Sequence, residues 1–324
     1  MTRVWRPIGR LLVRLVETNV ISAIVEQARI HLAELVASRR THARPGREIV
    51  VGLIGRGIQA SKTPRMHELE GSRIGLGYTY VLIDFDALGL ANADLGAVIE
   101  AAELLGFSGL NVTHPFKQSV VPLLDQLAPE AAAIGAVNTV VFADGRCIGH
   151  NTDCWGFAES FRENLADVPL DAVVQFGAGG AGAAVAHALL SLGAGKLTLC
   201  ETEISRAQAL AARLSERFGA AVAATSDPVW PVAGASGIVN TTPIGMDKYP
   251  GLPFPAALLH PSRWVAEIIY FPPQTELLRQ ATALGCRTLA GTGMAVYQAV
   301  KAFELFTGIA PDRSAMTAHF RAAA

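Results

Sequence analysis

The most restrictive feature of the sequence is a glycine-rich turn that joins a short apolar strand to an alanine-rich helix. Residues 173–176 are typical of a buried strand, and Gly177, Gly179 and Gly182 follow it in the spacing GxGxxG. The first glycine permits a tight turn, the second lets backbone amides approach a pyrophosphate, and the third allows close packing of helix on strand. The pyrophosphate would then lie at the positive end of the helix dipole. We therefore predict a dinucleotide site, against the alternative of a glycine-rich turn without a cofactor.

The strand after this helix, residues 196–201, ends in an acidic residue. Glu201 follows the glycines at about the 20-residue distance that the fingerprint expects. A carboxylate there accepts hydrogen bonds from the adenosine ribose of NAD and repels the 2′-phosphate of NADP. NADP binding usually needs an arginine at the next positions, which here are Thr202 and Glu203. Arg206, on the following helix, is the residue that could still reach that phosphate. We predict NAD as the cofactor, with NADP as the alternative.

Short apolar strands alternate with helical patterns along the rest of the chain. Residues 48–55 and 78–85 are typical of strands, 105–113 leads into a third, and 95–106 has apolar residues at helical spacing. The Asp-Gly pair within 136–153 predicts a hairpin. This alternation indicates an α/β fold with a mostly parallel sheet covered on both faces, and 324 residues are enough for two domains. Further strands are predicted at 196–201, 235–243 and 263–270, and further helices at 204–218 and 293–308.

The composition excludes several other classes of protein. Hydrophobic residues make up 51% of the chain and charged residues 17%, which is ample material for a buried core. A net charge of -1 offers no basic surface to a nucleic acid. The four cysteines form no CxxC pair, so we expect reduced thiols in a cytoplasmic protein and no metal site. No run of 18 apolar residues exists, so we expect no membrane span.

The first 47 residues differ from the rest of the chain. Four arginines recur there at near-helical spacing between apolar residues, and acidic residues interrupt the segment in a way that neither a secretory signal nor a transit peptide tolerates. We interpret the segment as a helical extension, or an over-long translation start, outside the catalytic fold. The alternatives are a membrane-surface helix and a partner-docking helix. The residues concerned are Arg3, Arg6, Arg10 and Arg14, and Glu17, Glu26 and Glu34.

Candidate catalytic groups follow the predicted strands. Lysine is scarce, at five of 27 basic residues, yet Lys117 lies in a polar loop directly after an apolar strand. An amine can exchange a proton where a guanidinium cannot, although a solvated surface lysine is the alternative. Asp153, Asn138, Ser61 and Thr63 also lie in segments that follow strands. Each alone has a simpler interpretation as a turn residue or helix cap, but the carboxyl ends of one sheet share a crevice in which ligands bind.

Seven motifs in order resemble those of shikimate dehydrogenases, over roughly residues 49–308. The resemblance implies a mostly parallel α/β substrate domain (48–153, rejoined by 289–324), a Rossmann NAD-binding domain (154–288), and an extension (1–47) outside them. It implies a small-molecule substrate, no nucleic-acid or membrane partner, and a monomer or homodimer. The motifs are GLIGRGIQASKTPRMHE, NVTHPFK, GAVNT, HNTD, GAGGAG, NTTPIGM and GMAVYQAVKAFELFTG.

The resemblance also implies roles for individual residues. Lys117 and Asp153 would be the catalytic pair, and Ser61 and Thr63 would hold a substrate carboxylate through their hydroxyls. Four residues would contact ring hydroxyls or the carboxylate: Thr113, Asn138, Tyr270 and Gln298. Segment 240–246 would lie by the nicotinamide, and the cofactor residues would be Gly177, Ala178, Gly179, Gly180, Ala181, Gly182, Glu201, Arg206, Thr241, Pro243, Gly245, Met246, Gly291 and Met294.

These residue types suit the oxidation of an alcohol, in which a hydride leaves to the nicotinamide and a proton to a base. Which member of the pair is formally the base stays open, because coupled groups titrate as a unit. The sequence departs from the common motifs at Gly57, Ala60, Thr63 and Glu201, and the last two resemble the quinate/shikimate branch that uses NAD. A biosynthetic NADP-dependent shikimate dehydrogenase or an aminoshikimate relative is the alternative enzyme. A non-catalytic metabolite sensor is disfavoured because both members of the pair are present. Quinate and shikimate are not distinguished.

Overall fold

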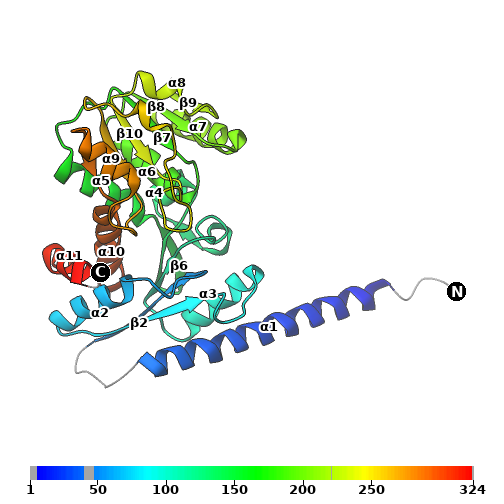
Figure 1. Cartoon of the computed structure of the whole chain (residues 1–324). Coiled ribbons are helices and arrows are strands. Elements are labelled where there is room, and N and C mark those ends of the chain that lie inside the picture. The colour runs from blue at the N-terminus through cyan, green and yellow to red at the C-terminus, as the bar shows by residue number, and fades with distance from the viewer. Residues whose placement is uncertain (1–5, 40–46, 220, 323–324) are drawn as a thin grey trace.

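The computed structural model describes residues 6–39, 47–219 and 221–322, and two six-stranded sheets organise them (Figure 1). In the first sheet, β1 pairs in parallel with β2 and β3, whereas β5 runs antiparallel to β3 and β6. Antiparallel pairing puts the start of one strand beside the end of its neighbour. The spatial order is β2 (Gly77–Asp84), β1 (Glu48–Gly55), β3 (Gly109–Val112), β5 (Thr139–Ala143), β6 (Arg146–His150) and β4 (Gln126–Leu127).

The second sheet is parallel throughout. Its first two strands along the chain, β7 and β8, are adjacent, but the chain then crosses back so that β10 pairs with the other side of β7. This is the Rossmann strand order, and its direction reverses between β7 and β10, the point at which such sheets bind dinucleotides. The spatial order is β12 (Arg287–Leu289), β11 (Trp264–Glu267), β10 (Gly237–Asn240), β7 (Ala172–Phe176), β8 (Lys196–Cys200) and β9 (Ala221–Thr225).

Helices cover both faces of both sheets, as the alternation of elements predicts. One core of the first sheet includes α3 and the other includes α2, α10 and α11, while α5, α6 and α7 pack on the second sheet. In Figure 1 the two sheets lie at opposite ends of the view, with α10 between them. The helices are α2 (Thr63–Arg73), α3 (Leu95–Leu104), α4 (Pro129–Ile134), α5 (Thr152–Asn164), α6 (Gly180–Ser191), α7 (Ile204–Phe218), α8 (Trp230–Ala233), α9 (Glu276–Ala283), α10 (Gly291–Thr307) and α11 (Arg313–Ala322), with short 3-10 turns at Asn92–Asp94, Val121–Leu123 and Ala256–Leu258.

The first turns of helix α1 (Arg6–Arg39) project beyond the first sheet, and its later turns lie along that sheet (Figure 1). Ala28 and Leu32 are buried in the same core as Val98 and Ile99 of α3. The later turns of α1 therefore pack on the first sheet instead of standing apart from it. None of the helices in the described ranges combines the length and the apolarity needed to cross a bilayer.

Two helices approach each other closely enough to require glycine. A Cβ on Gly156 of α5 would lie 2.6 Å from the backbone nitrogen of Gln298 and 2.9 Å from the carbonyl oxygen of Met294, both on α10. Such distances are below van der Waals contact, so a side chain there would push the helices apart. The contact holds α5, whose first turn carries Asp153, against α10.

Candidate active site

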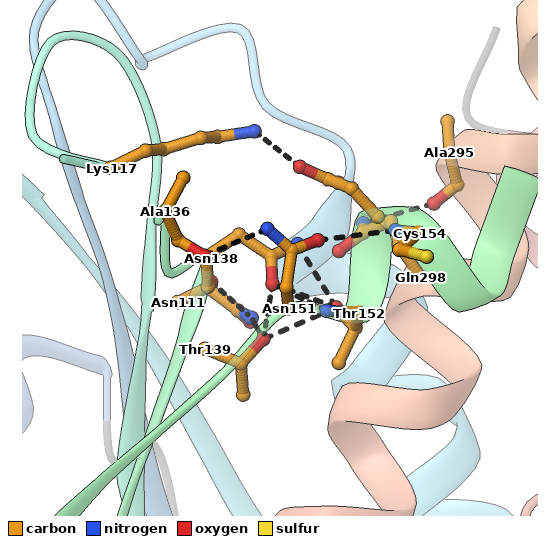
Figure 2. A network of polar contacts seen from close by, with 11 residues as sticks. Asn111, Lys117, Ala136, Asn138, Thr139, Asn151, Thr152, Cys154, Ala295 and Gln298 are labelled. Carbon is orange, nitrogen blue, oxygen red and sulfur yellow. Dashed lines mark hydrogen bonds and ion pairs between the residues drawn. The ribbon is translucent and has the colours of Figure 1, made fainter. Parts of the chain in front are cut away.

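Lys117 and Asp153 form an ion pair. The Lys117 Nζ lies 2.5 Å from the Asp153 Oδ2, and their side chains are 20% and 8% exposed (Figure 2). Lys117 lies in the loop after β3, and its carbonyl accepts a hydrogen bond from Val137 N at 2.7 Å. Asp153 lies in the first turn of α5, where Asn151 caps the helix by accepting from Cys154 N at 3.1 Å. The sequence elements that predict this pair are 36 residues apart, and the fold brings them together.

Asn138 ties the start of α5 to the first sheet. Its Oδ1 accepts from Thr152 N at 2.7 Å, and its Nδ2 donates to Thr152 Oγ1 at 3.0 Å. The prediction that Asn138 follows a strand is wrong, because it lies immediately before β5. Since β5 is antiparallel to β3 and β6, its first residue, Thr139, lies beside Asn111 and His150 at the carboxyl ends of those strands. Asn138 therefore lies at the expected edge of the sheet, at the carboxyl ends of β3 and β6, although it precedes its own strand.

A buried polar layer supports this arrangement. Asn111 is 5% exposed and donates from Nδ2 to Thr139 Oγ1 at 3.0 Å (Figure 2). Its Oδ1 accepts from the Tyr80 hydroxyl at 2.8 Å. Buried amides and hydroxyls that satisfy one another hold a single geometry, since any displaced member loses its partner. This layer fixes the position of α5 and hence of Asp153.

Asp84 holds loop 57–59, which leads into the residues predicted to bind the substrate carboxylate. This residue ends β2, is 2% exposed and accepts hydrogen bonds from loop 57–59 at 3.0–3.1 Å. Burial disfavours its charge, but the hydrogen bonds from Gln59 and from nearby backbone amides outweigh this and lower the pKa of Asp84. Thr63 begins α2, and its backbone amide donates to Ser61 Oγ at 3.4 Å. Both predicted hydroxyls therefore lie at a helix N-terminus, which favours an anion.

The other predicted substrate residues come from three different elements. Thr113 is half-buried after β3, and Gln298 of α10 donates from Nε2 to Ala295 O at 3.0 Å. Tyr270, after β11, is 44% exposed, and its ring meets that of Phe320 with centroids 5.9 Å apart. The buried part of its surroundings, and after it the charge of the Asp153 carboxylate, raise the pKa of Tyr270. Tyr270 therefore lies within electrostatic reach of the ion pair.

The glycine turn has the shape that a dinucleotide cradle requires. Gly177 has φ +98°, and a Cβ on Gly182 would lie 2.6 Å from Gly177 O, so only glycine permits this approach of helix to strand. A Cβ on Gly179 would meet nothing within 4 Å, which leaves space above the first N–H groups of α6. A Cβ on Gly180 would lie 3.5 Å from the Lys117 Cβ. The start of α6 is therefore directly beside the ion pair.

Glu201 is attached to this turn. It follows β8, its Oε2 accepts from Ala178 N at 3.0 Å, and its Oε1 accepts from Thr202 Oγ1 at 2.9 Å. Burial opposes ionisation, but these hydrogen bonds, a bond from Glu203 N and the charge of Arg206 outweigh it and lower the pKa of Glu201. The Arg206 Nη1 lies 3.7 Å from Glu201 Oε2. The carboxylate is thus charged at neutral pH beside the predicted adenosine end of the cradle.

The segment after β10 borders the other side of the turn. Thr241 donates from Oγ1 to Phe176 O at 2.7 Å and to Gly177 O at 3.0 Å. Gly245 has φ +117° and Met246 is 40% exposed, with Pro243 between Thr241 and Gly245 in the chain. Of the remaining predicted cofactor residues, Gly180 and Ala181 begin α6, and Gly291 and Met294 are buried in the first turns of α10.

Comparisons with known proteins decide the family. The substrate-binding domain model of shikimate dehydrogenase matches residues 53–140, and the C-terminal domain model of shikimate 5′-dehydrogenase matches residues 291–319. A shikimate dehydrogenase (NADP⁺) of Streptomyces avermitilis is 57% identical over 83% of this chain and 94% of its own length. The chain belongs to the shikimate dehydrogenase family. The family predicted from the seven motifs is confirmed.

Two further relatives of this shikimate dehydrogenase family member carry NAD in their names, so its named relatives include both cofactor types. A quinate/shikimate dehydrogenase (NAD⁺) of Corynebacterium glutamicum is 48% identical over 84% of this chain and 98% of its own length. The solved structure of quinate dehydrogenase from the same species in complex with NAD has a TM-score of 0.81 and 46% identity, covering 86% of this chain and 100% of that one. The mixed α/β fold with a Rossmann-type sheet is confirmed.

Sequence reasoning missed three supporting residues of this shikimate dehydrogenase family member. Asn111 and Asp84 organise the substrate side, and Glu267, at the end of β11, is 1% exposed beside the cofactor side. Asn111 interrupts an apolar strand, and Asp84 and Glu267 end apolar strands; that contrast is a signal that marks them as candidates, although it does not give their partners. Among the described residues, no group of three or more His, Cys, Asp or Glu side chains is arranged to hold a metal ion.

Proposed function

We propose that this chain oxidises a ring hydroxyl of shikimate or quinate to the corresponding ketone, reversibly, with NAD. The observation that carries the proposal is the position of Lys117. Its amine contacts Asp153 at 2.5 Å, and a Cβ added at Gly180, in the first turn of α6, would lie 3.5 Å from the Lys117 Cβ. An acid–base pair and a pyrophosphate cradle thus border the same small volume. The named relatives at 57% and 48% identity support the same reaction class.

The proposed chemistry divides the work between cofactor and chain. NAD, held at the turn of Gly177, Gly179 and Gly182, would supply the acceptor for the hydride of the carbinol carbon. When its amine is deprotonated, Lys117 can accept the hydroxyl proton as the carbonyl forms, and Asp153 orients that amine and balances the positive charge that develops on it. In the reverse direction the protonated amine returns the proton to the ketone oxygen. Because the pair is joined by one short contact, the two groups act as a unit.

The proposed substrate contacts follow from the loops around the pair. Ser61 and Thr63 would hold the substrate carboxylate at the N-terminus of α2, and Thr113, Asn138, Tyr270 and Gln298 would contact the ring hydroxyls. The first sheet with α10 and α11 would form the substrate domain (48–153 and 289–324), and the second sheet the cofactor domain (154–288). In the structure both the oxygen and the nitrogen of the Asn138 amide are hydrogen-bonded to Thr152, so a contact to substrate would be made in addition to these bonds.

The preference for NAD rests on the charge of Glu201. The carboxylate lies at the end of the second Rossmann strand, held by Ala178 N of the glycine turn, where a 2′-phosphate would meet a like charge. Arg206 is drawn toward acidic partners, with its Nη2 2.6 Å from Glu203 Oε2. A preference for NADP is the second candidate, because the relative at 57% identity is named for NADP⁺ and the one at 48% for NAD⁺.

Initial rates test the proposal directly. The purified chain is assayed with shikimate and with quinate, each against NAD and NADP. We expect turnover with at least one substrate, and a kcat/KM for NAD at least about 10-fold above that for NADP, the ratio that 1.4 kcal/mol of charge repulsion produces. Equal or better kcat/KM with NADP would reject the cofactor assignment. Absence of turnover with both substrates would reject the substrate assignment.

Glu201→Gln should weaken the discrimination between the cofactors. Removing the charge while keeping the shape leaves no repulsion for a 2′-phosphate, so the ratio of kcat/KM for NADP to that for NAD should rise by about 10- to 100-fold. Glu203→Gln is the matched control, because Glu203 is exposed, lies two residues away and also pairs with Arg206. A ratio that changes equally in both variants would show that Glu201 has no special part in cofactor choice.

A further inference from the structure

A carboxylate is buried among neutral partners where β10 and β11 end. Glu267 is the last residue of β11 and is 1% exposed. Its partner in the parallel register is Asn240, the last residue of β10 and 0% exposed. Burying a charged group without a cationic partner is costly, so its hydrogen bonds have to compensate. The hydrogen bonds show which parts of the chain the carboxylate serves.

One set of bonds leads to the loop after β10. The Asn240 Nδ2 donates to both Glu267 carboxylate oxygens at 3.1 and 3.0 Å and to Ile244 O at 2.9 Å. The Asn240 Oδ1 accepts from Thr242 N at 3.0 Å and from Thr242 Oγ1 at 2.7 Å. An amide whose oxygen and nitrogen are both used cannot rotate without losing bonds at each end. Glu267 thereby fixes the orientation of the Asn240 amide, which shapes loop 241–246.

A second set leads to the loop after β11. Glu267 Oε1 accepts from Ile269 N at 3.1 Å, and Oε2 accepts from Thr275 Oγ1 at 3.2 Å. Thr275 caps α9, accepting from Leu278 N at 3.3 Å. The carboxylate therefore holds both ends of loop 268–275, which carries the half-exposed Tyr270.

The two loops border the proposed site. Loop 241–246 is joined to the glycine turn through the bonds of Thr241 to Phe176 O and Gly177 O. Loop 268–275 brings Tyr270 within reach of the charge on Asp153. We propose that Glu267 is a positioning residue for the dehydrogenase reaction, which sets the spacing between the loop beside the cofactor turn and the loop that carries Tyr270. The expected effect of Glu267 on the reaction rests on the proposed function. Its expected effect on the two loops does not depend on turnover.

Amide hydrogen exchange on the full chain tests the structural part. Glu267→Met keeps the side-chain length and removes every acceptor, so exchange at Thr242, Ile244 and Ile269 should accelerate by about 10-fold or more through local opening. Glu267→Gln keeps one acceptor oxygen for Asn240 and Ile269 and gains a donor for Thr275, so it should restore slow exchange. Val265→Ala, a cavity two residues earlier on β11, is the control for general loss of packing. Acceleration in Val265→Ala equal to that in Glu267→Met would overturn the proposal.

Kinetics test the functional part. Glu267→Met should lower kcat/KM at least about 10-fold, through a raised KM for NAD and a lowered kcat, while Val265→Ala and Glu267→Gln stay within about twofold. Loop opening with unchanged kinetics would overturn the role in the reaction. Should Glu267→Met fail to fold, Thr275→Val removes the bond from Thr275 to the carboxylate and frees that end of loop 268–275. Exchange should then rise at Ile269, whose own bond to Glu267 remains, but not at Thr242. If the wild type is inactive toward both shikimate and quinate, the proposed function is rejected. The exchange measurement then still tests whether Glu267 positions the two loops.

Discussion

Replacing Lys117 with alanine is expected to lower kcat by about 10²- to 10⁴-fold, the usual contribution of a general acid–base group. The amine is the group that contacts the Asp153 carboxylate, and the stem of Lys117 lies beside the first turn of α6, so loss of the side chain removes the proposed proton acceptor from this site. The KM for substrate should change far less, because the proposed carboxylate contacts at Ser61 and Thr63 remain. Steady-state rates and a binding measurement with the substrate separate the two effects.

Two further variants sharpen this result. Lys117→Arg should not restore turnover, since a guanidinium stays protonated and cannot accept the hydroxyl proton. Asp153→Asn should lower kcat within the same range, and the double variant should cost little more than either single one, because the two groups act as a unit. Lys196→Ala, an exposed lysine at the start of β8, is the matched control. Near-wild-type turnover in Lys117→Ala would remove the basis of the dehydrogenase proposal.

The second large effect concerns stability and pH. Burial raises the pKa of Glu267 from its ordinary 4.5 to about 7, although hydrogen bonds from Asn240, Ile269 and Thr275 oppose this. A raised carboxyl pKa means that the folded protein holds the proton more tightly than the unfolded chain does. Its contribution to stability is therefore fully present below pH 4.5 and is lost as the pH rises through 7. A shift of this size corresponds to about 3 kcal/mol.

Glu267→Gln isolates this contribution because glutamine does not titrate. The free energy of unfolding of the wild type, relative to that of the variant, should fall by about 3 kcal/mol between pH 4.5 and pH 8. Urea unfolding at a series of pH values measures it. Glu216→Gln, an exposed carboxylate on α7, serves as the control and should show no comparable trend. A difference between wild type and Glu267→Gln that stays constant across this range would contradict the prediction.

The sequence was most informative at positions where the backbone geometry permits a single residue type, as at Gly177 and Gly182 of the turn after β7. The spacing of Gly177, Gly179 and Gly182 predicts both the turn and the close packing at Gly182, where a side chain would meet Gly177 O at 2.6 Å. The ordered motifs predict that Lys117 and Asp153 meet, although 36 residues separate them. Local spacing was sufficient for the glycine turn, whereas the meeting of Lys117 and Asp153 was implied by the resemblance of their motifs to those of a known family.

Features that depend on strand direction or on burial were not predictable in this way. Asn138 was placed after a strand because a short apolar run precedes it, whereas it lies before β5, and only the antiparallel pairing of β5 brings it to the right edge. Asn111 and Glu267 look like ordinary polar interruptions of apolar strands. Their roles appear only when the partners from other strands, Thr139 and Asn240, are in place. Such partners are set by tertiary pairing, which no local pattern contains.

The buried layer beneath Asp153 limits where this enzyme can change its substrate. Thr152 and Asn138 join the first turn of α5 to the first sheet at β5, so a substitution there would disturb the fold together with the proposed chemistry. By contrast, Met246, Tyr270 and Phe271 lie in loops at the rim and keep 40%, 44% and 55% of their surface in contact with solvent. Substitutions in these exposed loops can change substrate specificity without disturbing the contacts that position Lys117 and Asp153. We therefore expect sequence variation to be tolerated in the loops and not in the buried layer.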